Sequence, residues 1–454
     1  MADSIPDAGN SRARPPAAGG IGLYSAIAIG IGGMVGAGIF SILGVVAQAA
    51  GNGMWISFMV GGVVALLCTY SYAKLGVRFP SAGGAVEFLV QGFGDGVLSG
   101  GLNIYMWVGY VIALALYAQG FVGYALTFLP SQPQAWVPKG IGVGIVLLFT
   151  GVNLIGARTV GRAETFIVAV KLAILALFAG AGLFFIQSHN FSFSLMPPAQ
   201  GIFFGAGVLF IGYEGFGLVA NTAEDMANPR KLLPQALYLS VFTVILIYLG
   251  VSLAVIGNLD VPAIVAAKDY ALAQAAKPFL GEWGFKLVAV GALFSTASAI
   301  NATLFGGANV SYIIARDGEL PRFFDRQVWH RSSEGLLITA GLVILFILFF
   351  DLSGVAMMGS GAFLLIYAGV NAAHLRVTAA TGAKRWLVWL SLIACLIMLG
   401  VLSCYIYQNS KPALITMIGL LPFCFALEWA YRARTGRIIK PRIISGGGPA
   451  GSCL

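Results

Sequence analysis

GGMVGAGIF (residues 32–40) interrupts an apolar run that extends from Ile21 to Ala50. A run of this length can cross the hydrocarbon core of a bilayer, which is about 30 Å thick and requires roughly 20 helical residues. Five glycines fall between Gly30 and Gly38, and each weakens a helix by about 1 kcal/mol relative to alanine. Unwound backbone at membrane depth is tolerated only where it is buried in protein or lines a cavity. We therefore expect a broken transmembrane helix whose break is a site.

A second interrupted run lies in the other half of the chain. Residues 202–220 are apolar, and their middle reads IGYEGFG (residues 211–217). One such run alone is explained equally well by close helix packing, because small residues let transmembrane backbones approach each other. Two interrupted spans at corresponding places in two halves are instead typical of a midplane site in a secondary transporter.

The composition indicates a polytopic membrane protein. Of the 454 residues, 59% are hydrophobic and only 9% are charged, and the mean hydropathy is +0.89, which excludes a soluble globular protein. The sequence predicts twelve spans, of which the ninth is short: 21–48, 54–76, 97–128, 137–156, 163–186, 201–226, 234–256, 284–315, 335–350, 353–376, 386–407 and 411–431. The first 20 residues have no apolar core of a cleavable signal peptide.

The basic residues lie in alternating connections. Twenty of the 26 lysines and arginines fall in the two tails and the even-numbered connections, and five fall in the odd-numbered ones. The positive-inside rule then puts both termini in the cytoplasm. The net charge of +9 follows from this loop bias and does not indicate nucleic acid.

Two units of five spans each contain an odd number of crossings, so the second unit is inverted relative to the first. We expect a cytoplasmic N-terminal tail (1–20), a first five-helix repeat (21–186), a second inverted repeat (201–376), two additional helices (386–431) and a cytoplasmic C-terminal tail (432–454). Between spans seven and eight, residues 261–277 are too polar to cross and predict an external amphipathic helix lying over the site.

The predicted spans contain no arrangement of residues that would support enzyme catalysis. The five cysteines lie singly and read as small apolar residues, without metal spacing or a disulfide framework. His189, His330 and His374 fall in loops or at a span end, which leaves no histidine relay at mid-membrane. Neither a nucleophile with its base nor a set of metal ligands lies at depth. We expect no catalytic residues, no metal and no cofactor.

Four stretches carry a family resemblance. The run at residues 32–40, the turn YAKLGVRFPSAGG (72–84), the segment AEDMANPRKLLP (223–234) and the end ARDGELPRFF (315–324) resemble the amino acid–polyamine–organocation (APC) superfamily. The resemblance covers nearly the whole chain. Within the superfamily it is strongest to an archaeal, broad-specificity, proton-coupled amino acid transporter, through VGRAE (160–164), FIVAVKL (166–172) and ANV (308–310). The fold this implies is an all-α membrane protein with twelve transmembrane helices in a LeuT-type 5+5 inverted repeat, broken in helices 1 and 6.

The two breaks suit an amino acid zwitterion. Half-helix ends offer free amides for a carboxylate and free carbonyls for an ammonium. Span one supplies amides at Gly36, Ala37, Gly38 and Ile39, span six supplies carbonyls from Ile211 to Glu214, and the aromatic residues beside them are candidates to close over the substrate. The resemblance implies the same contacts. The expected substrate-binding residues are Met34, Val35, Gly36, Ala37, Gly38, Ile39, Phe210, Ile211, Tyr213, Glu214 and Phe216.

Lys171 sits eight residues into span five, about 12 Å deep at 1.5 Å per residue. A lysine near the bilayer centre costs about 2.5–3.5 kcal/mol on insertion scales, so a functional role is favoured over a snorkelling side chain. The resemblance puts its ammonium in the place of the ion of sodium-coupled relatives, with the Gly32 carbonyl and the Ser295 hydroxyl as partners and Ser298 as a second candidate. Burial disfavours a charged lysine, which makes proton coupling the leading hypothesis.

Glu214 is the one carboxylate that the sequence places well inside a span. The strongest resemblance has an apolar residue at this position, so the chain departs from it here. Three roles stay open: recognition of a cationic amino acid side chain, a second proton carrier, or an internal counter-ion for Lys171.

The sequence therefore predicts a multi-pass transporter of the cell membrane, with amino acids and protons as its partners alongside the lipid bilayer. We expect sodium-independent, proton-coupled uptake by alternating access. Two alternatives stay open. One is an amino acid exchanger, with Glu214 suited to cationic substrates, and the other is a nutrient receptor that binds without transporting. The short tails argue against the receptor.

Overall fold

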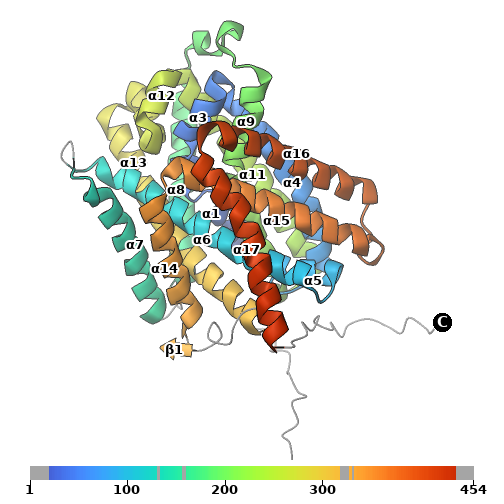
Figure 1. The fold of residues 1–454 in the computed structure, drawn as a ribbon. Helices are drawn as coiled ribbons and strands as arrows, with labels where there is room; N and C mark the ends of the chain where they lie inside the picture. Colours follow the sequence, from blue (N-terminus) through green and yellow to red (C-terminus); the bar gives the residue numbers. More distant parts are fainter. Residues whose placement is uncertain (1–19, 130–132, 156–159, 317–326, 330–331, 436–454) are drawn as a thin grey trace, which may run out of the picture.

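A computed structural model of the chain is built almost entirely of helices packed side by side (Figure 1). The structure describes residues 20–129, 133–155, 160–316, 327–329 and 332–435. The two predicted tails therefore lie outside the described residues, apart from Gly20 and residues 432–435. Most of the ARDGELPRFF end also lies outside them. Within the described residues, eleven helical segments are long and apolar enough to cross a membrane. The predicted ninth span is the shorter apolar helix α14 (Glu334–Phe349), with 16 residues.

The first repeat begins with a discontinuous helix. Span one is α1 (Leu23–Met34), α2 (Ala37–Ser41) and α3 (Leu43–Ala50), and the short helix η1 (Gly51–Gly53) leads into span two. The spans that follow are continuous helices: α4 (Met54–Arg78), α6 (Val97–Leu126), α7 (Trp136–Ile155) and α8 (Val160–Phe184).

The second repeat also begins with a discontinuous helix. The short helices η3 (Ser188–Phe191) and η4 (Phe193–Leu195) precede α9 (Ala199–Leu209), η5 (Phe210–Tyr213) and α10 (Phe216–Ala220), which make up span six. The turn η6 (Ala223–Asp225) leads to the remaining spans: α11 (Pro229–Asn258), α13 (Ala271–Arg316), α14, α15 (Leu352–Thr381), α16 (Arg385–Asn409) and α17 (Lys411–Thr435). Two short strands, β1 (Gln327–Trp329) and β2 (Ser332–Ser333), are the only described sheet.

α6 forms the centre of the molecule. It is buried along almost its whole length and crosses the middle of the bundle in Figure 1. α16 and α17 instead expose large apolar side chains such as Trp389 and Phe423, as expected of helices that face lipid. Span one packs against α6, α8, α11 and α13, and span six packs against α4, α11, α15 and α16, so each broken span is surrounded by other helices.

The connection between spans two and three contains a helix that the sequence did not predict. α5 (Ala85–Phe93) is too short to cross a membrane. It packs against α15 and α6 and buries Val86, Phe88 and Leu89. The preceding glycine turn and the short apolar stretch gave no periodic signal long enough to separate a packed helix from a loop.

The external segment differs from the single helix predicted over residues 261–277. α12 (Val261–Ala267) ends at the turn η7 (Lys268–Tyr270), and α13 then starts at Ala271. Gly281 breaks α13 with a φ of 63°, so its first ten residues are a separate helical arm. A Cβ on Gly44 would lie 2.4 Å from the Lys268 Cα, which shows how closely η7 approaches α3. α12 and α3 lie together at one end of the molecule (Figure 1).

Two groups of polar side chains have partners that the sequence did not indicate, and His374 lies within a helix instead of at the predicted span end. His374 is fully buried inside α15, where its ring nitrogens contact the hydroxyls of Ser71 (3.0 Å) and Thr381 (2.9 Å). Cys68 of α4 and Cys395 of α16 are not isolated, because their sulfurs lie 3.3 Å apart. Glu428 of α17 is a second fully buried carboxylate and packs against Gly100 of α6. These side chains lie far apart in the sequence, so spacing along the chain does not reveal that they are buried or paired.

Candidate functional site

The first break separates α1 from α2 at Val35 and Gly36. The Val35 amide still donates to the Ile31 carbonyl (2.8 Å) and closes α1, whereas Gly36 adopts φ −79° and ψ −115°, outside the helical region. The amides that begin α2 have no partner within their own helix, as at any helix N-terminus. Met34, Val35 and Ile39 are buried, so the break lies inside the protein.

The second break is a tight turn. α9 ends at Leu209, η5 continues to Tyr213, and Glu214 and Gly215 lead into α10. Ser360 of α15 spans this change of geometry, because its Oγ donates to the Val208 carbonyl (2.6 Å) and accepts from the Ile211 amide (2.9 Å). Ser360 thus satisfies backbone groups that the interrupted helix leaves without a regular partner.

The glycines bring the two broken spans into direct contact. A Cβ on Gly38 would lie 2.7 Å from the Gly212 Cα, and a Cβ on Gly215 would lie 2.3 Å from the Met34 amide nitrogen. Real Cβ atoms do not approach backbone so closely. The close packing that the sequence left open as an alternative is therefore present together with the breaks.

Tyr248 of α11 ties the two breaks together. Its hydroxyl lies 2.5 Å from the Met34 carbonyl oxygen and 2.9 Å from the Gly212 carbonyl oxygen. A hydroxyl has one proton to donate, so the two carbonyls share it. The sequence gives no sign of this role for Tyr248, because a lone tyrosine in an apolar span is usually a packing residue.

Lys171 reaches the first break from α8. Its side chain is 2% exposed, and its Nζ donates to the Gly32 carbonyl over 2.8 Å. Ser295 of α13 approaches the same end of α1, with its Oγ 2.9 Å from the Val35 carbonyl oxygen and 3.3 Å from that of Gly36. The lysine meets the Gly32 carbonyl and the serine meets the Val35 and Gly36 carbonyls, so both side chains contact the C-terminal end of the same half-helix. Ser298 is half-buried and makes none of the hydrogen bonds found among the described residues.

Glu214 faces tyrosines. It is 2% exposed, and its Oε1 accepts a hydrogen bond from the Tyr117 hydroxyl of α6 (3.0 Å). Its backbone carbonyl accepts from the Tyr367 hydroxyl of α15 (2.9 Å). Hydrogen bonds from phenols are the contacts expected of a buried carboxylate that lies out of reach of water.

The predicted aromatic residues lie in two different directions. Phe216 stacks on Tyr367 with ring centroids 5.0 Å apart, and Phe210 meets the same ring edge to face. Tyr213 turns toward α4 instead, where its hydroxyl donates to the Phe58 carbonyl (2.9 Å). Phe210 and Phe216 therefore border the region around Glu214, whereas the Tyr213 hydroxyl is already bonded elsewhere. Ile211 is buried and directs its side chain at Gly359 of α15.

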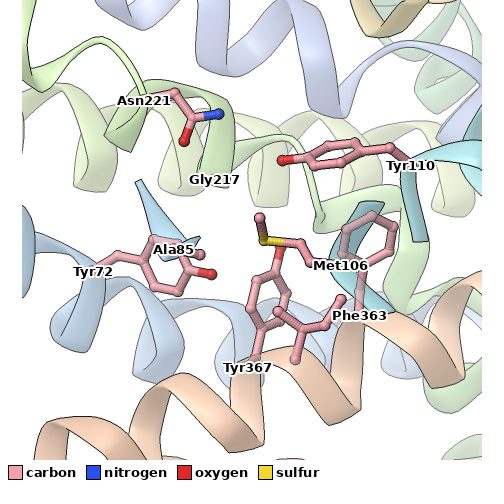
Figure 2. A pocket seen from close by; sticks show the side chains of 9 residues that line it. Tyr72, Ala85, Met106, Tyr110, Gly217, Asn221, Phe363 and Tyr367 are labelled. Carbon is pink, nitrogen blue, oxygen red and sulfur yellow. The ribbon is translucent and has the colours of Figure 1, made fainter. Parts of the chain in front are cut away.

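A cavity lies one helical turn beyond Glu214 and is shown in Figure 2. The cavity is small, with room for about one water molecule, and is partly open to the surface. Its lining comes from five helices and consists of Tyr72, Ala85, Met106, Tyr110, Gly217, Asn221, Phe363, Ile366 and Tyr367. Figure 2 shows the Tyr72 and Tyr110 hydroxyls and the Met106 thioether directed into this space. None of these residues was predicted, since they come from helices that are distant in the sequence.

Comparisons with known proteins agree with this architecture. Residues 21–428 match the model of a family described as amino acid permease. An uncharacterized protein of Methanocaldococcus jannaschii is 42% identical over 422 residues, covering 92% of this chain and 96% of that protein. The inner membrane transport protein YbaT of Escherichia coli is 34% identical over 407 residues, covering 88% and 94%. The crystal structure of a manganese transporter of Eremococcus coleocola superposes with a TM-score of 0.57 at 15% identity, covering 90% of this chain and 95% of that one.

Proposed function

The chain belongs to the amino acid permease family of the APC superfamily and is a membrane transporter with a LeuT-type fold, and from this premise we propose that it imports amino acids together with protons and without sodium. The observation that carries the proposal is the contact between Lys171 and Gly32. A buried ammonium 2.8 Å from a carbonyl of the broken helix holds a positive charge at a half-helix C-terminus, which is where such transporter folds coordinate cations. An ammonium group at that point makes a sodium ion unnecessary.

The substrate is proposed to bind between the two breaks. Its carboxylate is received by the amides at the start of α2, from Gly36 to Ile39, and its ammonium by carbonyls of η5. The Gly212 carbonyl already accepts from Tyr248, and the Glu214 carbonyl from Tyr367. Each carbonyl can exchange its tyrosine hydroxyl donor for the substrate ammonium when the substrate binds. Because Gly38 and Gly212 touch, a substrate that binds between the breaks has to part them, which links binding to movement of the two half-helices.

Proton coupling is proposed to act through the same lysine. When charged, Lys171 joins α8 to the end of α1 through the Gly32 carbonyl. When it releases its proton it becomes a weaker donor, so the two helices separate more easily. Proton and substrate then influence each other through one structural change, which is what coupling requires.

We further propose that Glu214 recognises the positive charge of lysine or arginine side chains. Its Oε1 already accepts a hydrogen bond from Tyr117, and an oxygen with more than one lone pair can accept from a further donor.

The proposed repeats, 21–186 and 201–376, place both breaks at corresponding first positions. On this scheme both termini and the even-numbered connections lie in the cytoplasm.

Uptake of labelled amino acids into proteoliposomes tests the proposal. Purified protein is reconstituted without sodium, and uptake is measured with and without an inward proton gradient. We expect accumulation above the equilibrium level only with the gradient. Uptake that rises steeply with sodium at fixed pH contradicts the proposal, and uptake that requires a second amino acid inside the vesicle shows an exchanger instead.

A further inference from the structure

The turn η7 is packed onto the half of span one that lies beyond the break. It contacts α2 and α3, which continue span one after Gly36, and it also contacts α6. A Cβ on Gly44 of α3 would lie 2.4 Å from the Lys268 Cα, and a Cβ on Gly123 of α6 would lie 2.5 Å from the Asp269 Cβ. η7 therefore lies directly against the half-helix whose first amides are proposed to receive the substrate carboxylate.

The backbone of η7 is strained in this position. Lys268 has a φ of 28° and is the single non-glycine residue with a positive φ in the part of the chain that the structure describes. Such a conformation persists only where surrounding contacts fix it. The Lys268 Nζ lies 3.3 Å from Asp351 Oδ2 at the start of α15, but both side chains are exposed, and exposed ion pairs add little. The docked position of η7 thus depends mainly on its close packing against α3 and α6.

Asp269 is the group of η7 that can weaken this packing. Its side chain is half-buried, and its Oδ1 is shut off from solvent with no hydrogen-bond partner among the described residues. The nearby Tyr124 hydroxyl does not supply one, because it donates to the Phe40 carbonyl over 2.6 Å. A buried carboxylate oxygen without a donor is costly when the group is charged. The protonated, neutral carboxyl therefore suits the docked position better than the carboxylate.

Few charged groups face Asp269 to offset this cost. α2, α3 and α12, which pack on η7, contain no charged residue, and Lys277 on the first arm of α13 is already in an ion pair. η7 lies between spans seven and eight, outside the membrane-crossing helices. Burial raises the pKa of the Asp269 carboxyl there, while Lys268 lowers it and Asp351 raises it.

We propose that Asp269 is a proton-operated latch at the outer end of the transporter: its protonated form keeps η7 docked on α3 and α6, and loss of the proton releases η7. The inference rests on the proposed proton-coupled transport and adds a proton-binding residue on the side from which the protons enter. Because the docked form has the higher pKa, docking is strongest at low pH and weakens as the pH rises. An acidic exterior then favours closure of the outer end, the step that follows substrate entry during uptake.

Asp269→Asn isolates the latch, because an amide keeps the size of the carboxyl and stays uncharged at every pH, as the protonated form does. Asp260→Asn is the matched control. It makes the same change of charge at an exposed position on the same connection, where the side chain makes no capping hydrogen bond to α12.

The measurement is hydrogen–deuterium exchange of the purified full-length protein at pH 5 and pH 8. It is read on residues 263–267 of α12, which is joined to η7 and packs on α3, and is expressed as protection relative to the intrinsic exchange rate at each pH. At pH 8 we expect protection in Asp269→Asn to exceed that of the parent at least about fivefold, and at pH 5 to lie within about twofold of it. Asp260→Asn should follow the parent at both pH values.

Two outcomes overturn the latch: the ratio of protection between Asp269→Asn and the parent is the same at both pH values, or Asp260→Asn has the same effect as Asp269→Asn. Should Asp269→Asn not fold, the parent alone decides, because constant protection from pH 5 to pH 8 also overturns the latch. Transport stands in these cases if amino acids accumulate in vesicles under a proton gradient. Conversely, a pH-dependent ratio in a protein that accumulates no amino acid supports the latch and contradicts the transport proposal.

Discussion

At the scale of single residues, two charged side chains are buried near the breaks and meet different partners. Lys171 donates to a backbone carbonyl of α1, and Glu214 accepts from a phenol of α6. Their surroundings differ, so their proposed roles are separable by substitution. A buried charge is costly unless its partners are retained, which is why each substitution is read against a matched variant.

Lys171→Ala is expected to stop proton-driven accumulation while some substrate binding remains. The substitution removes the bond to the Gly32 carbonyl, and with it the linkage between proton and substrate. In the parent protein the substrate Kd should depend on pH, and in Lys171→Ala it should depend on pH much less. The measurement is substrate binding over a pH series, with uptake in vesicles of equal protein content. Lys411→Ala, at an exposed helix start, is the control. Persistent pH-dependent accumulation in Lys171→Ala would move the coupling proton to Glu214.

Glu214→Gln separates the three roles of this carboxylate, since it keeps the size and removes the charge. For recognition of a cationic side chain, lysine and arginine should lose about 1.5–3 kcal/mol of binding, roughly tenfold to a hundredfold in Kd, while alanine and leucine lose little. The test is a comparison of Kd values for lysine and for norleucine, which differ in the terminal charge. An equal loss for both refutes recognition and favours a coupling role.

At the scale of elements, the broken helices of the two repeats are held together by backbone contact. α1 and α10 approach at Gly33 and Gly215, and α2 approaches η5 at Gly38 and Gly212. Tyr248 adds one hydroxyl between the two breaks. The glycines thus have two functions: they interrupt the helices, and they let the interrupted segments touch.

Gly215→Ala tests this contact. The added Cβ would lie 2.3 Å from the Met34 nitrogen and 2.4 Å from the Gly33 carbonyl carbon, both rigid backbone atoms. We expect a loss of about 1–3 kcal/mol of stability, as for other overpacked positions, seen as a lower melting temperature of the purified protein. Gly212→Ala, whose Cβ would have no neighbour closer than 3.4 Å, should melt close to the parent. Similar melting temperatures for the two variants would show that α1 and α10 are not packed this way.

At the scale of the whole molecule, the sequence predicts two inverted units, and the alternating basic connections predict the orientation of the chain in the membrane. The family and the fold agree with the predicted class of protein. Eleven described segments satisfy the length of a span, and α14 takes the predicted ninth place with 16 apolar residues. Orientation in the membrane is the part of this scheme that depends on charge alone.

The predicted orientation is checked with reporter fusions. Lys384 and Lys411 lie at opposite ends of α16. A green fluorescent protein fused after Lys384 should fluoresce, because that end is predicted to be cytoplasmic, and one fused after Lys411 should not. A fusion at the C-terminus should fluoresce again. The reverse pattern at the two lysines would invert the molecule and place the cavity of Figure 2 on the outer side.

The sequence by itself indicated the long apolar spans, both breaks and the position of Lys171 within a span. These features are local: they depend on the length of apolar runs, on glycines within them and on one charge far from either end of a span. The structure places Gly32, Lys171 and Ser295 at the end of α1, but their role in transport stays a prediction.

Only the tertiary structure decided which faces of the helices meet. The spans that supply Tyr248, Ser360, Tyr117 and the walls of the cavity are apolar on every side. They are so because lipid and the protein interior are equally apolar surroundings. Such spans carry no periodic signal to show which side chains point inward. The bond between Glu214 and Tyr117 joins residues 97 positions apart, and the Cys68–Cys395 contact joins residues 327 apart. Those pairings are set by the rotation and packing of whole helices, which no local pattern in the chain records.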